Sequence, residues 1–308
     1  MRQFILLSAF VALSACAETK PEIANQSPSD NLPEAVTTAA ETTADTKSMN
    51  LAAVLAAQPE EVQARYVYRH PAETLAFFGI EPGMTVVEAL PGGGWYSKLL
   101  LPYLGDDGAL IGANYAHSML KLFGFYSEER LKEMETWTSD WPTQAATWIP
   151  DNNTSISAFT FGNLPQTEAG GADAVLFVRA LHNLARFRDE DDFLQTAITD
   201  AYTILKPGGV VGVVQHRMRE EAPDAWAMGD RGYLKQSYVI EQMQQAGFVL
   251  EDSSELNANA LDIPEDGDRV WRLPPTLGGS KDKPEVAAAM TAIGESNRMT
   301  LRFRKPLT

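Results

Sequence analysis

The fold is decided by the stretch Thr85–Leu101, which reads TVVEALPGGGWYSKLLL. A short apolar run ends in the acid Glu88, the glycines Gly92, Gly93 and Gly94 follow, and apolar residues then recur at helical spacing. This order predicts a buried parallel strand, a tight turn and the start of a helix. Glycine suits a turn whose backbone must approach a ligand closely, because a Cβ there would clash.

The same stretch predicts a site for a nucleotide-like ligand. The free N–H groups and the positive dipole end at the start of a helix attract a carboxylate or a phosphate. We expect Glu88, at the strand end, to face ribose hydroxyls or a ligand amine. As a dinucleotide-binding fingerprint the turn is incomplete, because Ser97 stands where the third glycine belongs. A plain strand-to-helix turn is the alternative that this stretch leaves open.

Composition excludes several classes of function. The chain of 308 residues is long enough for one α/β domain with insertions. Its formal net charge of −16 opposes binding to polyanionic nucleic acid and to anionic lipid, so we expect neither as a direct partner. Cys16 is the only cysteine, which rules out an intrachain disulfide, a thiolate zinc site and a three-cysteine iron–sulfur cluster.

Residues 1–16 have the layout of a secretory signal peptide, with an early positive charge and an apolar run too short to span a bilayer. The end of this segment, LSAC, resembles the bacterial lipobox, which implies lipidation of Cys16 and an anchor without a transmembrane helix. Ala17, rather than Asp, at the second mature position implies sorting to the outer membrane. We therefore expect an exported, periplasmic, lipid-anchored protein. An uncleaved leader with an incidental cysteine is the alternative.

The segment that follows predicts a tether. Residues 17–49 are rich in Thr, Ala, Pro, Ser and Glu and contain almost no large apolar side chain. Such a segment cannot bury enough apolar surface to offset its ordering entropy. We predict a disordered acidic tether here and one folded domain over residues 50–308.

Strand and helix patterns alternate along this domain. Residues 257–285 have the composition of a long loop, typical of a lid or a flexible insertion. We expect helices in residues 51–78, after the glycine turn, after the acidic residues 189–192 and over residues 233–247. We expect strands at residues 85–88, 109–115, 155–161, 171–178, 210–214, 248–253 and 298–304.

Polar side chains follow two of the central strands. His182 comes shortly after the strand at 171–178, and His216 directly follows the strand at 210–214. The carboxyl ends of parallel strands share one rim, where α/β folds bind ligands. Two histidines in one cleft indicate an acid/base pair or a metal site, but the sequence identifies no third metal ligand. Pinning a loop is the structural alternative for each histidine.

Two further groups of residues are candidates for ligand contacts. Tyr66, Arg69 and His70 precede the first strand, where they could lie across the open side of the ligand. The alternative is that Arg69 and His70 only satisfy carbonyls at a helix end. The second strand ends in Asn114, at a position where nucleotide-binding folds commonly place an acid for the ribose. An amide there could still hydrogen-bond a diol.

The order of elements, with the turn LKPGG at residues 205–209, resembles class I S-adenosylmethionine-dependent methyltransferases over roughly residues 65–306. Within that family the chain is similar to a group of predicted bacterial methyltransferases, several of them exported. The segments that carry this similarity are RHPAE at 69–73, PGGGWY at 91–96, HN at 182–183 and SNRMTL at 296–301.

The resemblance implies a doubly wound α/β fold with a seven-stranded, mostly parallel sheet whose last strand is antiparallel. It implies S-adenosylmethionine as cofactor, held by Glu88, by the turn Gly92–Gly94, by Asn114 at the ribose and by Asn163 near the adenine amine. The chain departs from the family at Leu90, where the first motif glycine is usual, and at Asn114, where the ribose acid is usual.

The resemblance also implies methyl transfer to an acceptor that the sequence does not identify and that we expect to be a small molecule. His182 or His216 would be the base, and Tyr66, Arg69 and His70 would contact the substrate. The sequence does not indicate the oligomeric state.

Two other functions are weighed against methyl transfer. The donor is made in the cytoplasm, whereas the leader exports the chain, so a non-catalytic, small-molecule-binding surface lipoprotein is the first alternative. A nicotinamide-dependent oxidoreductase would share the first strand–helix–strand unit. Ser97 in the fingerprint and the turn at residues 205–209 argue against the oxidoreductase.

Overall fold

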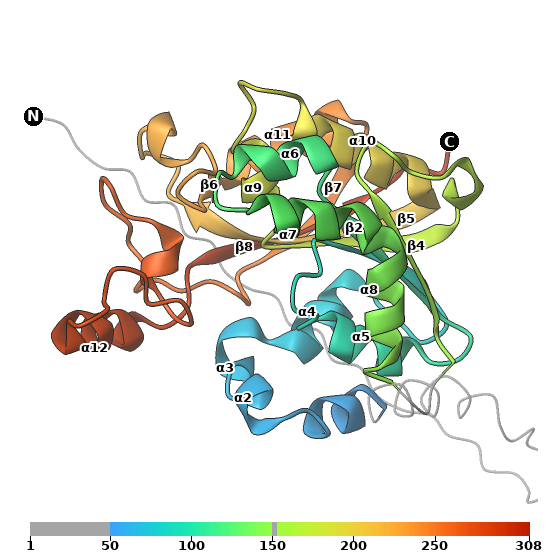
Figure 1. Cartoon of the computed structure of the whole chain (residues 1–308), viewed down its shortest axis with the longest axis horizontal. Coiled ribbons are helices and arrows are strands. Elements are labelled where there is room, and N and C mark those ends of the chain that lie inside the picture. The colour runs from blue at the N-terminus through green and yellow to red at the C-terminus, as the bar shows by residue number, and fades with distance from the viewer. Residues whose placement is uncertain (1–49, 150–152) are drawn as a thin grey trace, which may run out of the picture. The chain divides into compact units, whose positions relative to one another are not determined.

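The structure is a computed structural model that describes residues 50–149 and 153–308 (Figure 1). The predicted signal peptide, the lipidation site Cys16 and the predicted tether up to residue 49 lie outside the described residues.

One mostly parallel sheet forms the centre of the domain. Its strands are β1 (Thr85–Ala89), β2 (Ala109–Asn114), β3 (Ser155–Thr160), β4 (Ala172–Val178), β5 (Leu205–Met218), β6 (Leu234–Lys235), β7 (Val249–Ser254) and β8 (Arg298–Arg304). The order across the sheet is β3-β2-β1-β4-β5-β8-β7, and β6 pairs with the end of β5 outside this path. β3, β2, β1, β4 and β5 pair in parallel, whereas β8 pairs antiparallel with both β5 and β7. The expected fold class, with its antiparallel last strand, is confirmed.

Helices follow most of the strands, as the alternating pattern predicted. Residues 50–56 are helical, and the named helices are α2 (Glu60–Gln63), α3 (Tyr66–Arg69), α4 (Pro71–Phe78), α5 (Ser97–Leu104), α6 (His117–Leu122), α7 (Glu128–Glu133), α8 (Trp137–Ala146), α9 (Leu181–Ala185), α10 (Phe193–Ile204), α11 (Gln236–Gln245) and α12 (Pro284–Ile293). Short 3₁₀ turns lie at Met134–Thr136, Gln166–Glu168, Asp224–Trp226 and Val270–Arg272. Within the described ranges, no helix is both long and apolar enough to cross a bilayer.

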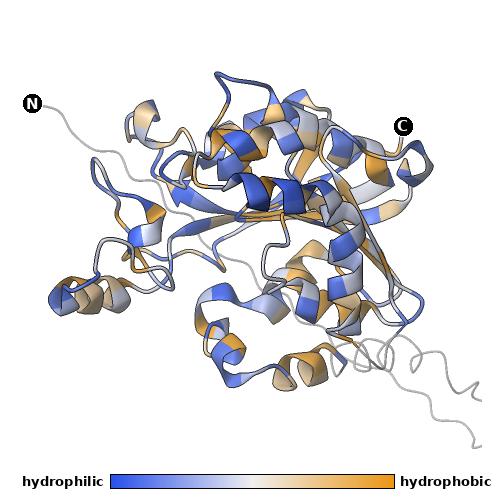
Figure 2. Ribbon diagram, in the orientation of Figure 1, coloured by the Kyte–Doolittle hydropathy of each residue, from blue (hydrophilic) through white to orange (hydrophobic). Residues whose placement is uncertain are grey.

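Helices cover both faces of the sheet (Figure 1). One apolar core joins the sheet to α9, α10 and α11, and a second joins its other face to α4, α5 and α8. Because side chains alternate along a strand, Val87 belongs to the first core and Val86 to the second. Glu88 shares the face of Val86 and is therefore directed toward α5. The central strands are mostly apolar (Figure 2), as expected for parallel strands buried on both faces.

The glycine in β2 makes room for an aromatic side chain. A Cβ on Gly112 would lie 2.7 Å from the ring of Trp141, which is buried and stacks on Trp137 with ring centres 5.6 Å apart. The contact packs α8 closely against the sheet. Replacing Trp141 by alanine would cost about 3–5 kcal/mol, the range for a large buried aromatic side chain.

Three expectations about the elements are wrong. The start of helix α12 lies in the region expected to be a loop. The helix begins at Pro284, and proline suits a first helical turn. None of its side chains is buried, so its sequence lacks the apolar periodicity that predicts a helix. Helix α11 begins at Gln236 rather than at 233, because Leu234 and Lys235 extend beside β5 as β6. β5 begins at Leu205, before the expected turn, because Leu205 pairs with Ala172 of β4. The boundaries of β8 are confirmed.

Candidate functional site

A cavity of about 540 Å³ opens at the carboxyl ends of β1, β4 and β5. Its size falls within the range of about 300–1,000 Å³ that is usual for small-molecule sites. Gly92 and Gly93 contribute the wall after β1, and Arg179 contributes the wall after β4. Loop residues 270–276, which the sequence marked as part of a possible lid, form a further wall. Pocket walls that come from several strand ends are the arrangement expected of an α/β ligand site.

The structure brings the two predicted catalytic histidines together in this cavity. The ring centres of His182 and His216 are 5.3 Å apart, and both side chains are buried and line the cavity. His182 lies in α9, directly after β4, and His216 lies within β5. The ring of Trp271 meets that of His182 edge-on, with centres 5.9 Å apart.

The hydrogen bonds of Gln215 determine which nitrogen of His182 carries hydrogen. The Gln215 amide nitrogen donates to the carbonyls of Gly232, at 3.0 Å, and His216, at 3.3 Å. Its Oε1 therefore faces His182 Nδ1 at 3.2 Å as an acceptor. We assign the hydrogen to Nδ1, which leaves the lone pair on Nε2. Burial lowers the pKa of His182 to about 4, although the hydrogen bond to Gln215 opposes that shift, so the ring is neutral at pH 7.

His216 is also a neutral imidazole. Its Nδ1 lies 2.6 Å from the hydroxyl of Ser296, which also accepts a hydrogen bond from Arg298 Nε at 3.2 Å. Burial holds the pKa of His216 well below its ordinary value; the proximity of His182, which would repel a second proton, and the charge of Arg298 act in the same direction.

Glu88 lies behind the cavity rather than in its wall. Its side chain is buried, and Ser97 donates a hydrogen bond of 2.5 Å from its hydroxyl to Glu88 Oε2. Burial raises the pKa of Glu88 to about 7, although Ser97 and Arg179 oppose that shift. Ser97, which replaces the third glycine of the dinucleotide fingerprint, thus supplies the partner of this acid. The residues that line the cavity do not include Glu88.

The three glycines of the turn have different surroundings. Gly92 and Gly93 line the cavity, and a Cβ on Gly93 would meet nothing within 4 Å. Gly94 has a φ of +75°, and a Cβ there would lie 2.3 Å from the ring of Trp148. Gly94 is therefore required for packing, whereas Gly93 leaves backbone open to a ligand.

The two asparagines predicted to hold the cofactor do not line this cavity. Asn114 is buried at the end of β2, where its Oδ1 accepts a hydrogen bond from the Tyr115 amide at 2.8 Å. Asn163 is exposed after β3, and its side-chain amide donates to the Thr160 hydroxyl at 3.2 Å.

Two of the three predicted substrate residues support the cavity wall through Trp95. Tyr66 meets the ring of Trp95 edge-on, and the Arg69 guanidinium lies 4.4 Å from the centre of that ring. Trp95 itself lines the cavity. His70 instead lines a separate surface hollow beside Asn257. Its backbone N–H donates to the Tyr66 carbonyl at 2.8 Å, at the end of α3.

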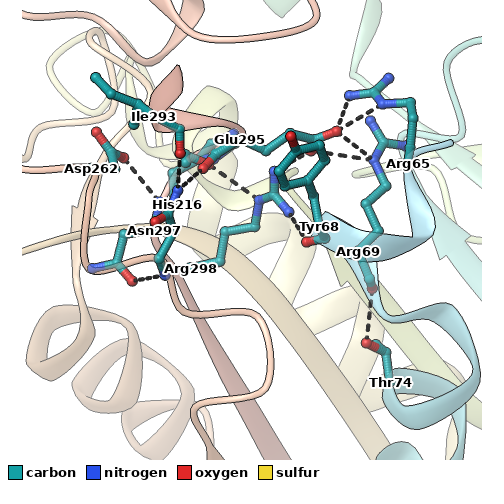
Figure 3. A network of polar contacts seen from close by, with 12 residues as sticks. Arg65, Tyr68, Arg69, Thr74, His216, Asp262, Ile293, Glu295, Asn297 and Arg298 are labelled. Carbon is teal, nitrogen blue, oxygen red and sulfur yellow. Dashed lines mark hydrogen bonds and ion pairs between the residues drawn. The ribbon is translucent and has the colours of Figure 1, made fainter. Parts of the chain in front are cut away.

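Sequence reasoning missed a cluster of charges beside the histidines (Figure 3). Glu295 forms ion pairs with Arg65 and Arg298, and its Oε1 lies 3.3 Å from Arg69 Nε. Only the three-residue spacing of Glu295 and Arg298 is visible in the sequence. Arg179 was nevertheless accessible to prediction, because it directly follows a recognised strand.

A metal site of three protein ligands is not supported by the residues present. In residues 50–149 and 153–308, no group of three His, Cys, Asp or Glu side chains is arranged to hold an ion. The histidine pair is therefore interpreted through hydrogen bonding and proton transfer.

The strand order, with its antiparallel β8, and the cavity at the strand ends define a doubly wound, Rossmann-like α/β fold. No protein-family model and no curated protein sequence matches the chain. Among solved structures, the chain is similar to a SAM-dependent methyltransferase from Aquifex aeolicus, with 12% identity, a TM-score of 0.47, and coverage of 80% of this chain and 98% of that one.

Two further solved structures are similar to a comparable degree. The [4+2]-cyclase SpnF is 17% identical over 78% of this chain and 81% of its own, with a TM-score of 0.46. The 1,6-didemethyltoxoflavin-N1-methyltransferase of Burkholderia thailandensis, whose structure contains S-adenosylhomocysteine, is 13% identical over 90% of this chain and 93% of its own, with a TM-score of 0.42. These similarities concern the fold alone.

Proposed function

We propose that this protein transfers a methyl group from S-adenosylmethionine to a small-molecule acceptor bound in the cavity. The observation that carries the proposal is that the glycine turn after β1 and the pair His182 and His216 line one cavity. The turn is the element that the sequence assigned to the cofactor, and the histidines are the groups that it assigned to proton transfer.

The residues at the turn fit such a donor. Gly92 and Gly93 present backbone without a side chain to the cavity, and the space beside Gly93 is open. Glu88 lies behind them with its hydroxyl partner Ser97. Asn114 does not line the cavity, so the fit of the cofactor to this site is argued from the glycine turn.

S-adenosylmethionine, when bound, supplies an electrophilic methyl group on a sulfonium. The chain must align the acceptor and receive a proton from it where the nucleophile is protonated. His182 Nε2 is suited to accept a hydrogen bond from an acceptor hydroxyl or amine, because Gln215 holds the hydrogen on Nδ1. Trp95 and Trp271 line the same cavity and make part of its wall apolar.

Calorimetric titration of the full chain with S-adenosylmethionine and S-adenosylhomocysteine tests the proposal. We expect micromolar binding of both ligands, lost in Gly93→Val, which fills the open space in the wall. Gly93→Ala is the matched smaller substitution and should weaken binding less. Thermal unfolding of each variant establishes that it is folded. Absence of heat with either ligand, from folded protein, would overturn methyl transfer and leave the non-catalytic binding lipoprotein.

We also propose that the domain works outside the cytoplasm, attached through a lipid on Cys16. The lipobox-like segment that ends in Cys16 supports this proposal. We expect the chain, expressed in a Gram-negative host, to be found in the outer-membrane fraction. The Cys16→Ser variant, which cannot be lipidated, should be absent from that fraction. Equal distribution of the two chains would contradict the anchor. An exported domain requires a route by which the donor reaches it.

A further inference from the structure

The cavity is cationic although the chain is strongly acidic. The chain has a net charge of −16, yet the charged residues in the cavity wall are Lys98, Arg179 and Arg298 against the single carboxylate Glu295. A local excess of positive charge in a recessed, partly apolar site attracts anions more strongly than the same charges do on an open surface.

The single carboxylate is already fully engaged. Glu295 is buried between Arg65, Arg69 and Arg298, which approach it from two sides of the site (Figure 3). One negative charge thus faces three guanidinium groups. The ion pairs of Glu295 are therefore all with these three arginines.

Arg179 also lines the cavity, and no anion within the described part of the chain forms an ion pair with it. Among the residues that the structure describes, its guanidinium forms no hydrogen bond and no ion pair, and its attraction to Glu295 acts only through space. The side chain is partly buried and lines the cavity. A guanidinium in this position carries five donors suited to a carboxylate or a phosphate.

The backbone holds Arg179 in an uncommon conformation. Its φ is +57°, in the left-handed region that costs a residue other than glycine about 1–3 kcal/mol. Its amide donates a 2.6 Å hydrogen bond to the Val214 carbonyl of β5, which fixes the residue at the end of β4. Strain that places an unpaired cation in a cavity indicates a binding role for that cation.

The electrostatic surroundings of Arg179 favour a nearby anion. Burial, and then the charge of Arg298, lower the pKa of Arg179 to about 10. Burial similarly lowers the pKa of Arg69 to about 9, with the charge of Arg179 next, and Arg69 Nη1 is buried without a hydrogen-bond partner in the described chain. A ligand anion would offset these repulsions.

Part of the remaining wall is apolar. Trp95, Trp271, Val270 and Leu273 line the cavity together with the two neutral histidines. Aromatic side chains in a pocket wall favour a ligand with a planar, apolar body.

We propose that this cavity binds a small organic anion with a flat apolar body, whose carboxylate or phosphate group pairs with Arg179. We further infer that this anion is the methyl acceptor; that assignment, unlike the anion site itself, rests on the proposed function.

Binding of benzoate and of its neutral counterpart benzamide to the full chain tests the anion site. We expect benzoate to bind at least about tenfold more tightly than benzamide at low ionic strength, because a charge-assisted pair is stronger than a neutral hydrogen bond. Added salt should weaken benzoate binding and leave benzamide binding unchanged. Inorganic phosphate serves as a second probe without an apolar body. Equal affinities for benzoate and benzamide, or no binding of benzoate or phosphate at millimolar concentration, would overturn the proposal.

Substitutions of Arg179 test whether this residue binds the anion. We expect Arg179→Met to lose the preference for benzoate, and Arg130→Met, on the exposed surface of α7 away from the cavity, to retain it. Retained preference in folded Arg179→Met would overturn the assignment. Should Arg179→Met not fold, Arg179→Lys keeps the charge but not the planar donors, and a several-fold loss of benzoate affinity is expected. Unchanged affinity in Arg179→Lys would overturn the assignment equally.

Saturation with S-adenosylhomocysteine distinguishes two sources of the anionic group. Benzoate that still binds beside this product is expected if the anion belongs to the acceptor. Competitive displacement of benzoate would show that Arg179 holds the carboxylate of the donor, which overturns the acceptor assignment. Benzoate binding through Arg179, without any binding of S-adenosylhomocysteine, would overturn methyl transfer and leave the anion site standing.

Discussion

The ring centres of His182 and His216 lie 5.3 Å apart in the interior, and neither ring faces a carboxylate as its hydrogen-bond partner. Their partners are instead an amide oxygen and a hydroxyl, from Gln215 and Ser296. Two rings this close, buried and beside several arginines, are neutral at neutral pH. The acid stability of the protein should depend on this pair.

Replacing His182 by asparagine should reduce the loss of stability in acid. The unfolded chain takes up a proton at this histidine below about pH 6.5, whereas the folded chain does so only near the lowered pKa of about 4. The free energy of unfolding therefore falls as the pH drops from 6.5 to 4. At pH 5 the histidine accounts for about 2 kcal/mol of that fall. Urea unfolding at pH 5 and pH 7 measures the difference, and identical pH dependence of the two proteins would contradict it.

Replacing Glu88 by glutamine should stabilise the protein at high pH. The folded pKa of Glu88 is raised to about 7 from an ordinary value of 4.5. Between these values the folded chain keeps a proton that the unfolded chain has lost, so the free energy of unfolding falls as the pH rises. Above pH 7 the cost is about 3 kcal/mol, at 1.36 kcal/mol for each unit of pKa. Glutamine carries no charge and can still accept the hydrogen bond of Ser97. We expect Glu88→Gln to be more stable in urea at pH 8 and similar at pH 4; lower stability at pH 8 would refute this.

Removing the charge of Glu295 should destabilise the fold. Glu295→Gln leaves Arg65, Arg69 and Arg298 without their shared carboxylate, two of them buried. Breaking a buried ion pair in this way costs about 3–5 kcal/mol. The expected result is a clear fall in thermal midpoint at pH 7.

The matched control for Glu295 is Glu133→Gln. Glu133 pairs with Arg130 on an exposed helix surface, where both side chains are more than half accessible. Exposed pairs contribute about 0–1 kcal/mol, so the control should change the midpoint little. Equal effects of the two substitutions would show that the cluster around Glu295 is not stabilising.

Alanine at Gly94 and at Gly93 should have opposite consequences. Gly94→Ala places a Cβ 2.3 Å from the ring of Trp148 at a φ of +75°, and overpacking with strain costs about 1–3 kcal/mol. Gly93→Ala meets no atom within 4 Å and should leave stability nearly unchanged while weakening S-adenosylhomocysteine binding. Thermal unfolding and calorimetry of both variants measure the two effects. A stable Gly94→Ala variant would contradict the role of Gly94 in packing.

The convergence of His182 and His216 was predictable because it depends on local pattern and a general rule. Each follows an apolar run that is recognisable as a parallel strand, and parallel strands present their carboxyl ends at one rim. Glu88 also lies near the carboxyl end of such a strand, but it lies behind the cavity. Side-chain alternation places Glu88 on the same face of the sheet as Val86, where Ser97 of α5 donates a hydrogen bond to it.

The cationic cluster could not be predicted in the same way. Arg65 and Glu295 are 230 residues apart in sequence, and their contact exists only because α3 and the start of β8 meet at the cavity. Helix α12 was missed for a related reason: without a buried face, it leaves no apolar periodicity in the sequence. Nothing in residues 50–308 bears on Cys16 and the leader, which remain predictions from sequence.

The sequence by itself determined the elements around the glycine turn, the class of the sheet and the rim on which the histidines lie. These follow from backbone and solvent requirements that act locally: apolar runs must be buried, and glycine permits backbone that other residues do not. Tertiary structure alone decided which charges are paired, which way Glu88 points, and that Arg179 forms no ion pair with the residues that the structure describes. Pairing and burial depend on distances between segments far apart in the chain, and the energy of a charge depends on those distances and on the surrounding dielectric.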